Sequence, residues 1–201
     1  MRFKEYINEI RSIHGDVPAQ SSFDLEKFTK DCAPFLLALK GSKFLAWHGT
    51  IAAPAEWELI TLHAVRAPRD TPRNFHNSVD NILESKFGWR ARSSSIFTNG
   101  STLVADSYGE PCAVFPVGKF KSLWSPDVSD LTALYGKMGA FDALKFLDNK
   151  CEWHFNSELQ QGLAKKNEVL IGAEKCYLIN INGDTYQKIL QPWLAKNGII
   201  T

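Results

Sequence analysis

Residues 168–181 read "EVLIGAEKCYLINI", and this stretch does most to decide the fold. It contains two short apolar runs rich in β-branched residues, separated by a turn at Gly172–Ala173. Apolar runs of this length, bounded by turn residues, are typical of buried strands. The stretch therefore predicts two strands late in the chain.

On either side of this stretch, segments with apolar residues at helical spacing alternate irregularly with short strand-like runs and loops. Because helices lie early and late and strands are separated by loops, the order favours α+β over an alternating parallel α/β design. The apolar spacing and breaker residues predict helices over 3–13, 24–39 (kinked or divided at Pro34), 75–87 (closed by Gly88), 102–110 (after an N-cap at Ser101), 129–149 (one or two, broken near 137–140) and 184–198. Strands are expected at 43–49, 57–66 (or a short helix), within 91–99 and at 111–118.

Composition indicates one globular domain over residues 1–201. A 1–40 helical segment would precede a 41–201 core. With 44% hydrophobic residues the chain can build a sizeable core, and a formal charge of +1 gives no global attraction to nucleic acid or an anionic membrane. No window approaches 18 apolar residues, and the four cysteines lack a C-x-x-C pair. We expect a cytoplasmic protein with reduced thiols, no membrane partner and no metal site.

The run "KFLAWHGTIA" at 43–52 places a histidine directly after a strand-like stretch. On its own, His48 is a packed core residue, a catalytic base, a metal ligand or a hydrogen-bonding group for a sugar. Dinucleotide, phosphate-loop, nucleophile-elbow and zinc-protease motifs are all missing from the sequence. Its role therefore depends on partners elsewhere in the chain.

Three stretches together resemble the ADP-ribosyltransferase superfamily: "LAWHGT" (45–50), "SSIFTNGSTLVADSYG" (94–109) and "NEVLIGAEKCYLI" (167–179). The first is similar to the Trp-His-Gly motif of the poly(ADP-ribose) polymerase and diphtheria-toxin branch. The second is similar to the middle strand and helix, and the third to the strand that opens with the catalytic glutamate. The motifs occur in the family's order. The compact size also resembles phage-encoded transferases, which would act in a host cytoplasm.

The resemblance implies a split mixed β-sheet core with helices around it, NAD as the substrate and Glu168 as the catalytic carboxylate. Cleavage of the nicotinamide glycosidic bond passes through an oxocarbenium-like transition state. A carboxylate near the ribose stabilises that charge, and fixed groups of this kind are often the largest catalytic contribution. The resemblance gives His48 the second catalytic position, where it would hold the other ribose.

The same resemblance supplies a set of NAD-binding residues. Gly49 would let the backbone approach the nicotinamide amide, and Thr50 would add a hydroxyl. Phe97 and Tyr108 would present flat surfaces to the nicotinamide ring, although both aromatic residues could equally belong to the core. The cofactor-binding set is His48, Gly49, Thr50, Phe97 and Tyr108.

Departures from the family pattern bear on the acceptor, which would be a protein or a nucleic acid. Lys166 stands two residues before Glu168, where arginine-directed toxins carry an acidic residue or Gln. Single-unit transfer is expected rather than chain elongation. Trp153 and Phe155 could stack on a base or contact a protein, and Lys166 could meet phosphate or an acidic patch. A helix start that packs both aromatics on the core is the alternative.

A group of basic residues also has a simple alternative. Arg90 and Arg92, with the basic run 66–73, could contact the NAD pyrophosphate or a nucleic-acid backbone, or could be surface residues without a role. Two other classes of function also stay open. One is an inactive binding module on the same fold. The other is a hydrolase that pairs Cys112 or Cys176 with His63 or His154.

Overall fold

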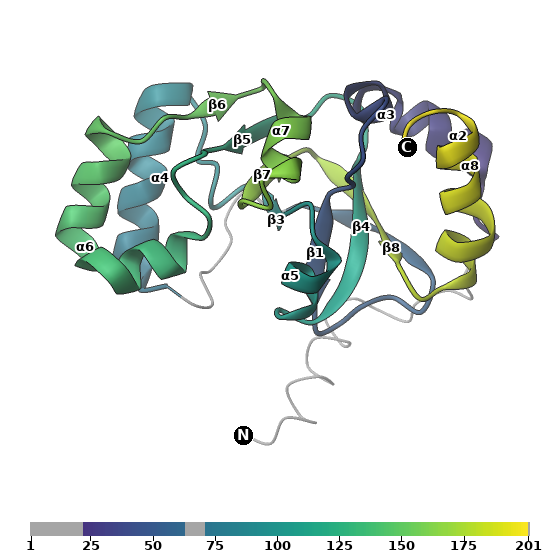
Figure 1. Ribbon diagram of the computed structural model, residues 1–201, viewed down its shortest axis with the longest axis horizontal. Coiled ribbons are helices and arrows are strands. Elements are labelled where there is room, and N and C mark those ends of the chain that lie inside the picture. The colour runs from purple at the N-terminus through teal and green to yellow at the C-terminus, as the bar shows by residue number, and fades with distance from the viewer. Residues whose placement is uncertain (1–21, 63–70, 201) are drawn as a thin grey trace, which may run out of the picture.

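A computed structural model describes residues 22–62 and 71–200 of the chain, so the helix expected at 3–13 lies outside the described residues. The described part contains two four-stranded sheets that lie side by side (Figure 1). The first sheet has the strand order β1 (Trp47–Thr50), β4 (Glu110–Pro116), β8 (Lys175–Asn180), β2 (Trp57–Thr61). The second has the order β3 (Ile96–Thr98), β7 (Val169–Gly172), β5 (Lys121–Trp124), β6 (His154–Phe155).

The expected α+β class is confirmed, but the sheets are not mixed as expected. Every pairing between the named strands of the described chain is antiparallel. Strands β7 and β8 are joined by a short turn, yet β7 belongs to one sheet and β8 to the other. The stretch 168–181 thus forms both predicted strands and carries the chain from the second sheet to the first.

Helices cover the outer sides of the two sheets (Figure 1). On the first sheet lie α2 (Leu25–Asp31), α3 (Ala33–Leu39), the π-helical turn η1 (Thr185–Leu190) and α8 (Gln191–Lys196). On the second lie α4 (Arg73–Phe87) and α6 (Leu131–Asn149). The short helices α5 (Thr102–Asp106) and α7 (Leu159–Ala164) follow β3 and β6 in the chain.

Two apolar clusters explain why these elements pack in this way. The larger cluster joins α2, α3 and the C-terminal helices to the first sheet. Within it the rings of Phe28 and Phe115 meet edge to face, with 5.0 Å between their centroids. The smaller holds α4 and α6 on the second sheet. On β7, Val169 and Ile171 belong to the larger cluster and Leu170 to the smaller. A strand buried on both faces requires the continuous apolar run seen in the sequence.

The breaks expected in the helices are present. Cys32 separates α2 from α3, and Pro34 lies in the first turn of α3. Helix α4 ends at Gly88 in the left-handed conformation. Helix α6 is kinked at Gly139, where φ is 75° and ψ is 169°. This backbone conformation is essentially restricted to glycine, so the kink is fixed by the residue type.

Several expected boundaries were wrong. The first strand begins at Trp47 rather than at residue 43, and β2 ends at Thr61. Strands β5 and β6 and helix α7 were not predicted, because each is short and none has a repeated apolar period. Helices α2 and α3 pack in the same cluster as the first sheet, so residues 25–39 share the core of the sheet.

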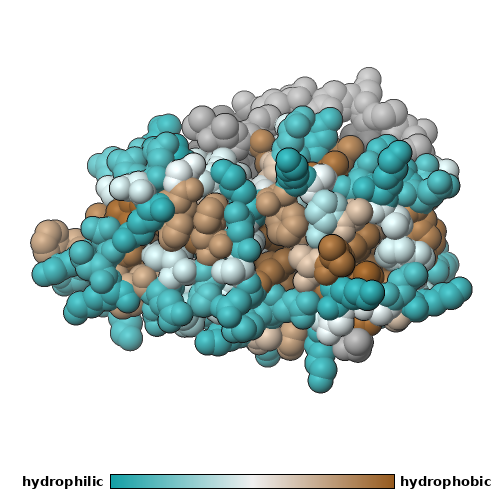
Figure 2. Space-filling model, turned by 90° about the horizontal axis from the view of Figure 1, so that it is seen from above, coloured by the Kyte–Doolittle hydropathy of each residue, from teal (hydrophilic) through white to brown (hydrophobic). Residues whose placement is uncertain are grey.

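Figure 2 shows one face of the molecule, on which apolar residues lie between charged and polar ones. Among the helices of the described residues, none has both the length and the apolar character needed to cross a membrane.

Candidate functional site

A cleft of about 140 Å³ lies where the two sheets meet. It receives residues from β1, from β3 and the loop after it, from α4 and α5, and from the segments that precede α6 and β7. Its lining consists of Trp47, His48, Gly49, Thr71, His76, Arg92, Phe97, Thr98, Asn99, Val104, Tyr108, Ser129, Asp130, Thr132, Lys166 and Glu168.

Backbone hydrogen bonds hold the two sheets together at this cleft. The N–H of Trp47 donates to the carbonyl of Asn99 at 2.8 Å, and the N–H of Asn99 donates back at 3.0 Å. Next to this bridge, Nδ1 of His48 lies 2.8 Å from the carbonyl oxygen of Phe97. A carbonyl only accepts, so Nδ1 carries the proton, and in the neutral ring Nε2 is then an acceptor. The fold thereby sets the tautomer and the orientation of the imidazole.

Gly49 lines the cleft, and its lack of a side chain also has a structural reason. A Cβ atom at this position would lie 1.9 Å from the carbonyl oxygen of Ala105 and 2.9 Å from Cβ of Tyr108. Helix α5 therefore approaches β1 more closely than any larger residue allows. The sequence prediction that Gly49 makes room for a ligand did not anticipate this contact.

Tyr108 connects the two sides of the cleft mouth. Its hydroxyl donates to Oδ2 of Asp130 at 2.9 Å, while Oδ1 of the same carboxylate accepts from the N–H of Ala133 at 2.7 Å and caps α6. As a residue, Tyr108 is 42% exposed, and it lines the cleft. This exposure is compatible with the predicted contact to a ligand.

Glu168 lies at the start of β7 and forms an ion pair with Arg92. Nη1 of Arg92 is 2.7 Å from Oε1 of Glu168, and the side chains are 6% and 18% exposed. The guanidinium also lies over the ring of Phe97, 4.5 Å from its centroid. One face of Phe97 is therefore covered by Arg92, which limits the ring surface that a planar ligand could use.

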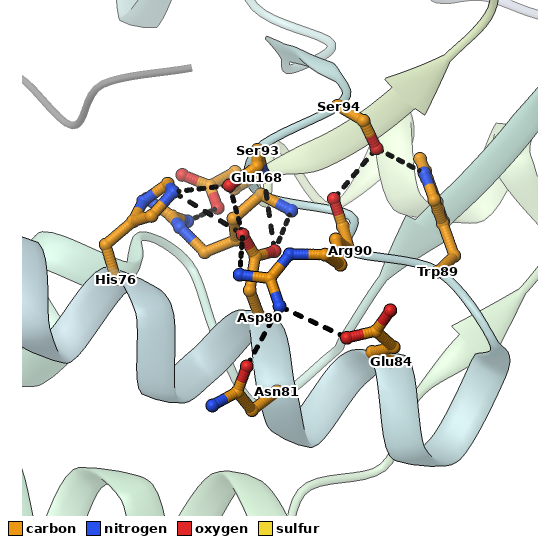
Figure 3. Close-up of polar contacts among 10 residues, drawn as sticks. His76, Asp80, Asn81, Glu84, Trp89, Arg90, Ser93, Ser94 and Glu168 are labelled. Carbon is orange, nitrogen blue, oxygen red and sulfur yellow. Dashed lines mark hydrogen bonds and ion pairs between the residues drawn. The ribbon is translucent and has the colours of Figure 1, made fainter. Parts of the chain in front are cut away.

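A buried carboxylate on α4 fixes the segment that carries Arg92 (Figure 3). Oδ1 of Asp80 accepts from the backbone N–H of Arg92 at 2.8 Å and from that of Ser93 at 3.3 Å. Its Oδ2 accepts from the Ser93 hydroxyl and lies 3.5 Å from Nε2 of His76. Asp80 is completely buried, and Arg90 reaches it from the protein surface at 3.8 Å.

The predicted site residues divide into two groups. His48, Gly49, Phe97, Tyr108, Lys166 and Glu168 all line the cleft, although they come from distant parts of the sequence. Thr50 is absent from the described lining, and its hydroxyl accepts from the N–H of Ala52 at 3.2 Å.

Trp153 and Phe155, predicted to contact the acceptor, lie elsewhere. Both pack against the smaller apolar cluster, where Phe155 is 5.3 Å from the ring of Phe87. Nε1 of Trp153 donates to the carbonyl of Leu147 at 3.1 Å. These contacts match the alternative in which both aromatic side chains pack on the core. The segment forms β6, however, and not the start of a helix.

The most important residues missed by the sequence prediction are Asp80 and His76. Both lie on the inner face of α4 with Leu83, and both are buried. The available signal was their helical spacing, since polar residues at 76 and 80 share the stripe of apolar residues at 83 and 87. Arg92 was noted as a basic residue, but nothing in the sequence indicates that it pairs with Glu168.

The cysteines are poorly suited to nucleophilic chemistry. All four are free thiols, and Cys112 and Cys176 are fully buried in the first sheet. Burial raises the pKa of each of these two to about 12, so the reactive thiolate is scarce at neutral pH. The ring nitrogens of His154 lie 3.2 Å from a carboxylate oxygen of Glu152 and 2.5 Å from one of Glu158, and the ring stacks on Trp124. His63 lies outside the described residues.

Within residues 22–62 and 71–200, no group of three or more His, Cys, Asp or Glu side chains is arranged to hold a metal ion. We found no match of the chain to a protein-family model, to a curated protein or to a solved structure.

Proposed function

We propose that the protein is a mono-ADP-ribosyltransferase. It would cleave NAD at the nicotinamide glycosidic bond and transfer ADP-ribose to a macromolecular acceptor. The observation that carries the proposal is that His48 and Glu168 line one cleft together with Gly49, Phe97 and Tyr108. The sequence resemblance alone names these residues, which come from segments far apart in the chain.

The chemistry of the cleft is compatible with this reaction. When the C–N bond breaks, its electron pair stays on the ring nitrogen, so the pyridinium leaves as neutral nicotinamide and needs no strong acid. The ribosyl carbon then carries positive charge, which the carboxylate of Glu168 would stabilise. The acceptor atom forms the new bond to that carbon and releases its proton to solvent or to a nearby base.

His48 would act through its Nε2 side, since Nδ1 donates to Phe97. In the neutral ring, Nε2 would accept a hydrogen bond from a ribose hydroxyl. Lys166 is exposed at the cleft and has a left-handed backbone with φ of 59°. Its position supports an acceptor group that carries phosphate or carboxylate near the reacting centre.

The test is to incubate the protein with NAD and measure free nicotinamide, with and without a cell lysate. We expect release by the wild type and a loss of about 10²-fold or more in Glu168→Gln, as for removal of one strong electrostatic group. Glu174→Gln, in the exposed turn after β7, is the matched control and should retain activity. Mass spectra of lysate proteins and nucleic acids after reaction with isotopically labelled NAD would identify the acceptor.

The other outcomes separate the alternative functions. NAD binding without nicotinamide release would contradict the transferase and support a binding module. Activity that is unaffected by Glu168→Gln but lost on thiol alkylation would support the hydrolase, in spite of the buried positions of Cys112 and Cys176.

A further inference from the structure

The carboxylate of Glu168 is connected to the interior of α4 through Arg92. Arg92 is 5% exposed as a residue, and its guanidinium contacts Glu168 at 2.7 Å and the ring of Phe97 at 4.5 Å. Among the described residues, the buried Nε of Arg92 has no hydrogen-bond partner. These two contacts orient the guanidinium toward the cleft.

The backbone of Arg92 is fixed from the opposite side. Asp80 accepts from the N–H groups of Arg92 and Ser93, and it also accepts from the Ser93 hydroxyl. Figure 3 shows that the carboxylate rises from α4 toward this segment, with His76 and Arg90 on either side. A carboxylate that accepts several N–H and O–H bonds in a buried position is strongly held, because each bond lost would leave a buried polar group unsatisfied.

We infer that Asp80 and Arg92 are positioning residues for Glu168: Asp80 fixes the backbone of Arg92, and the Arg92 guanidinium holds the carboxylate at the cleft. This inference rests on the proposed function. It is reasonable on energetic grounds because catalytic groups must be held close to the productive geometry by their supporting contacts. Arg92 suits the role because its planar guanidinium can bond a carboxylate and stack on an aromatic ring together, which a lysine cannot do.

A kinetic double-mutant cycle tests the connection between Arg92 and Glu168. We expect Arg92→Gln to lower kcat for nicotinamide release by about 10²-fold, with little change in KM for NAD. Arg92→Lys should recover part of this loss. Combined with Glu168→Gln, Arg92→Gln should cause no further loss, since residues that act as one unit are not additive. Lys86→Gln is the matched control, because Lys86 is a cation on α4 that contacts Asp148 and does not line the cleft.

A second cycle tests the role of Asp80. Asp80→Asn is expected to lower kcat in the wild-type background and to have no effect on kcat in the Arg92→Gln background. A residue that merely stabilises the fold would lower kcat by the same factor in both backgrounds. Such a result for Asp80→Asn would overturn the inference. So would an Arg92→Gln substitution that lowers kcat by the same factor in the wild type and in Glu168→Gln. Either result leaves the transferase proposal in place.

Thermal unfolding of the same variants controls for loss of folding. Arg92→Gln removes the guanidinium charge that pairs with the largely buried Glu168 carboxylate, whereas the double variant with Glu168→Gln carries neither charge. We expect the double variant to unfold at a higher temperature than Arg92→Gln alone. The reverse order would overturn the pairing itself. A wild type that releases no nicotinamide would overturn both the transferase proposal and the positioning role, and is readily distinguished from the other outcomes.

Discussion

At the scale of single residues, the cleft depends on side chains whose geometry is set by the backbone of a neighbouring element. His48 is the clearest case, because the Phe97 carbonyl determines which of its ring nitrogens carries the proton. A hydrogen bond from one ring nitrogen to a fixed backbone carbonyl sets the tautomer and the direction of an imidazole. A histidine held in this way can present a defined hydrogen-bonding atom to a ligand without a rotameric cost on binding.

We predict that His48→Ala weakens NAD binding by about 1–3 kcal/mol, the loss expected when a buried hydrogen-bond partner is removed. Isothermal titration with NAD would measure it. His48→Asn is the informative companion, since its amide nitrogen can replace Nδ1 as the donor to Phe97 but supplies nothing at Nε2. Affinity equal to that of the wild type in His48→Asn would show that the Nε2 side does not bind NAD.

At the scale of elements, the C-terminal helices are anchored by an acidic residue from a distant loop. Glu56, just before β2, accepts from the N–H of Thr185 at 2.7 Å and from that of Asp184 at 3.2 Å. These are the first N–H groups of η1, which the helix itself leaves unpaired. The hydrogen bond from Thr185 is the main cause that lowers the pKa of Glu56 below its usual value.

We predict that Glu56→Ala lowers the free energy of unfolding by about 1 kcal/mol at neutral pH, the usual cost of losing a helix cap. Because the pKa of Glu56 is lowered by folding, its stabilisation is complete above the pKa of the unfolded chain. It disappears as pH falls through the folded pKa. Urea unfolding at pH 7 and at pH 3 would measure the difference between wild type and variant.

The difference between wild type and Glu56→Ala should shrink at the lower pH. Glu58→Ala, exposed on β2, is the matched control and should show a smaller effect at both pH values. A difference that is equal at pH 7 and pH 3 would mean that the charge of Glu56 does not contribute to the cap.

At the scale of the whole molecule, the cleft lies between two sheets that share the larger apolar cluster, which includes Ile96, Trp124 and Ile171 of the second sheet, whereas α4 and α6 pack in the smaller cluster. The direct connections at the cleft include the backbone pair of Trp47 and Asn99, the bond from His48 to Phe97 and the bond from Tyr108 to Asp130. A ligand that contacts both sides adds to these connections and stabilises the folded state by mass action.

We predict that NAD at about 100 times its Kd raises the free energy of unfolding by about 2.7 kcal/mol. For a chain of this length the melting temperature should rise by about 5–10 °C. A thermal scan with and without NAD would measure the shift. Glu168→Gln should retain most of it, because the carboxylate acts mainly on the transition state. A melting temperature that NAD leaves unchanged in both proteins would contradict NAD binding at the cleft.

The sequence alone was sufficient for the α+β class, for most helices and for the strands with continuous apolar runs. These features follow from local periodicity, from breakers such as Pro34 and Gly88, and from the double-sided burial of the 168–181 stretch. It also selected six of the residues that line the cleft: His48, Gly49, Phe97, Tyr108, Lys166 and Glu168.

Tertiary structure alone decided that β7 and β8 belong to different sheets and that Arg92 pairs with Glu168 above a buried Asp80. The physical reason is the range of the interactions. Periodicity, capping and turn chemistry act over a few residues and are visible in any short window. The partner of a charge or of a strand edge is chosen by burial among segments far apart in the chain, and no local pattern records that choice.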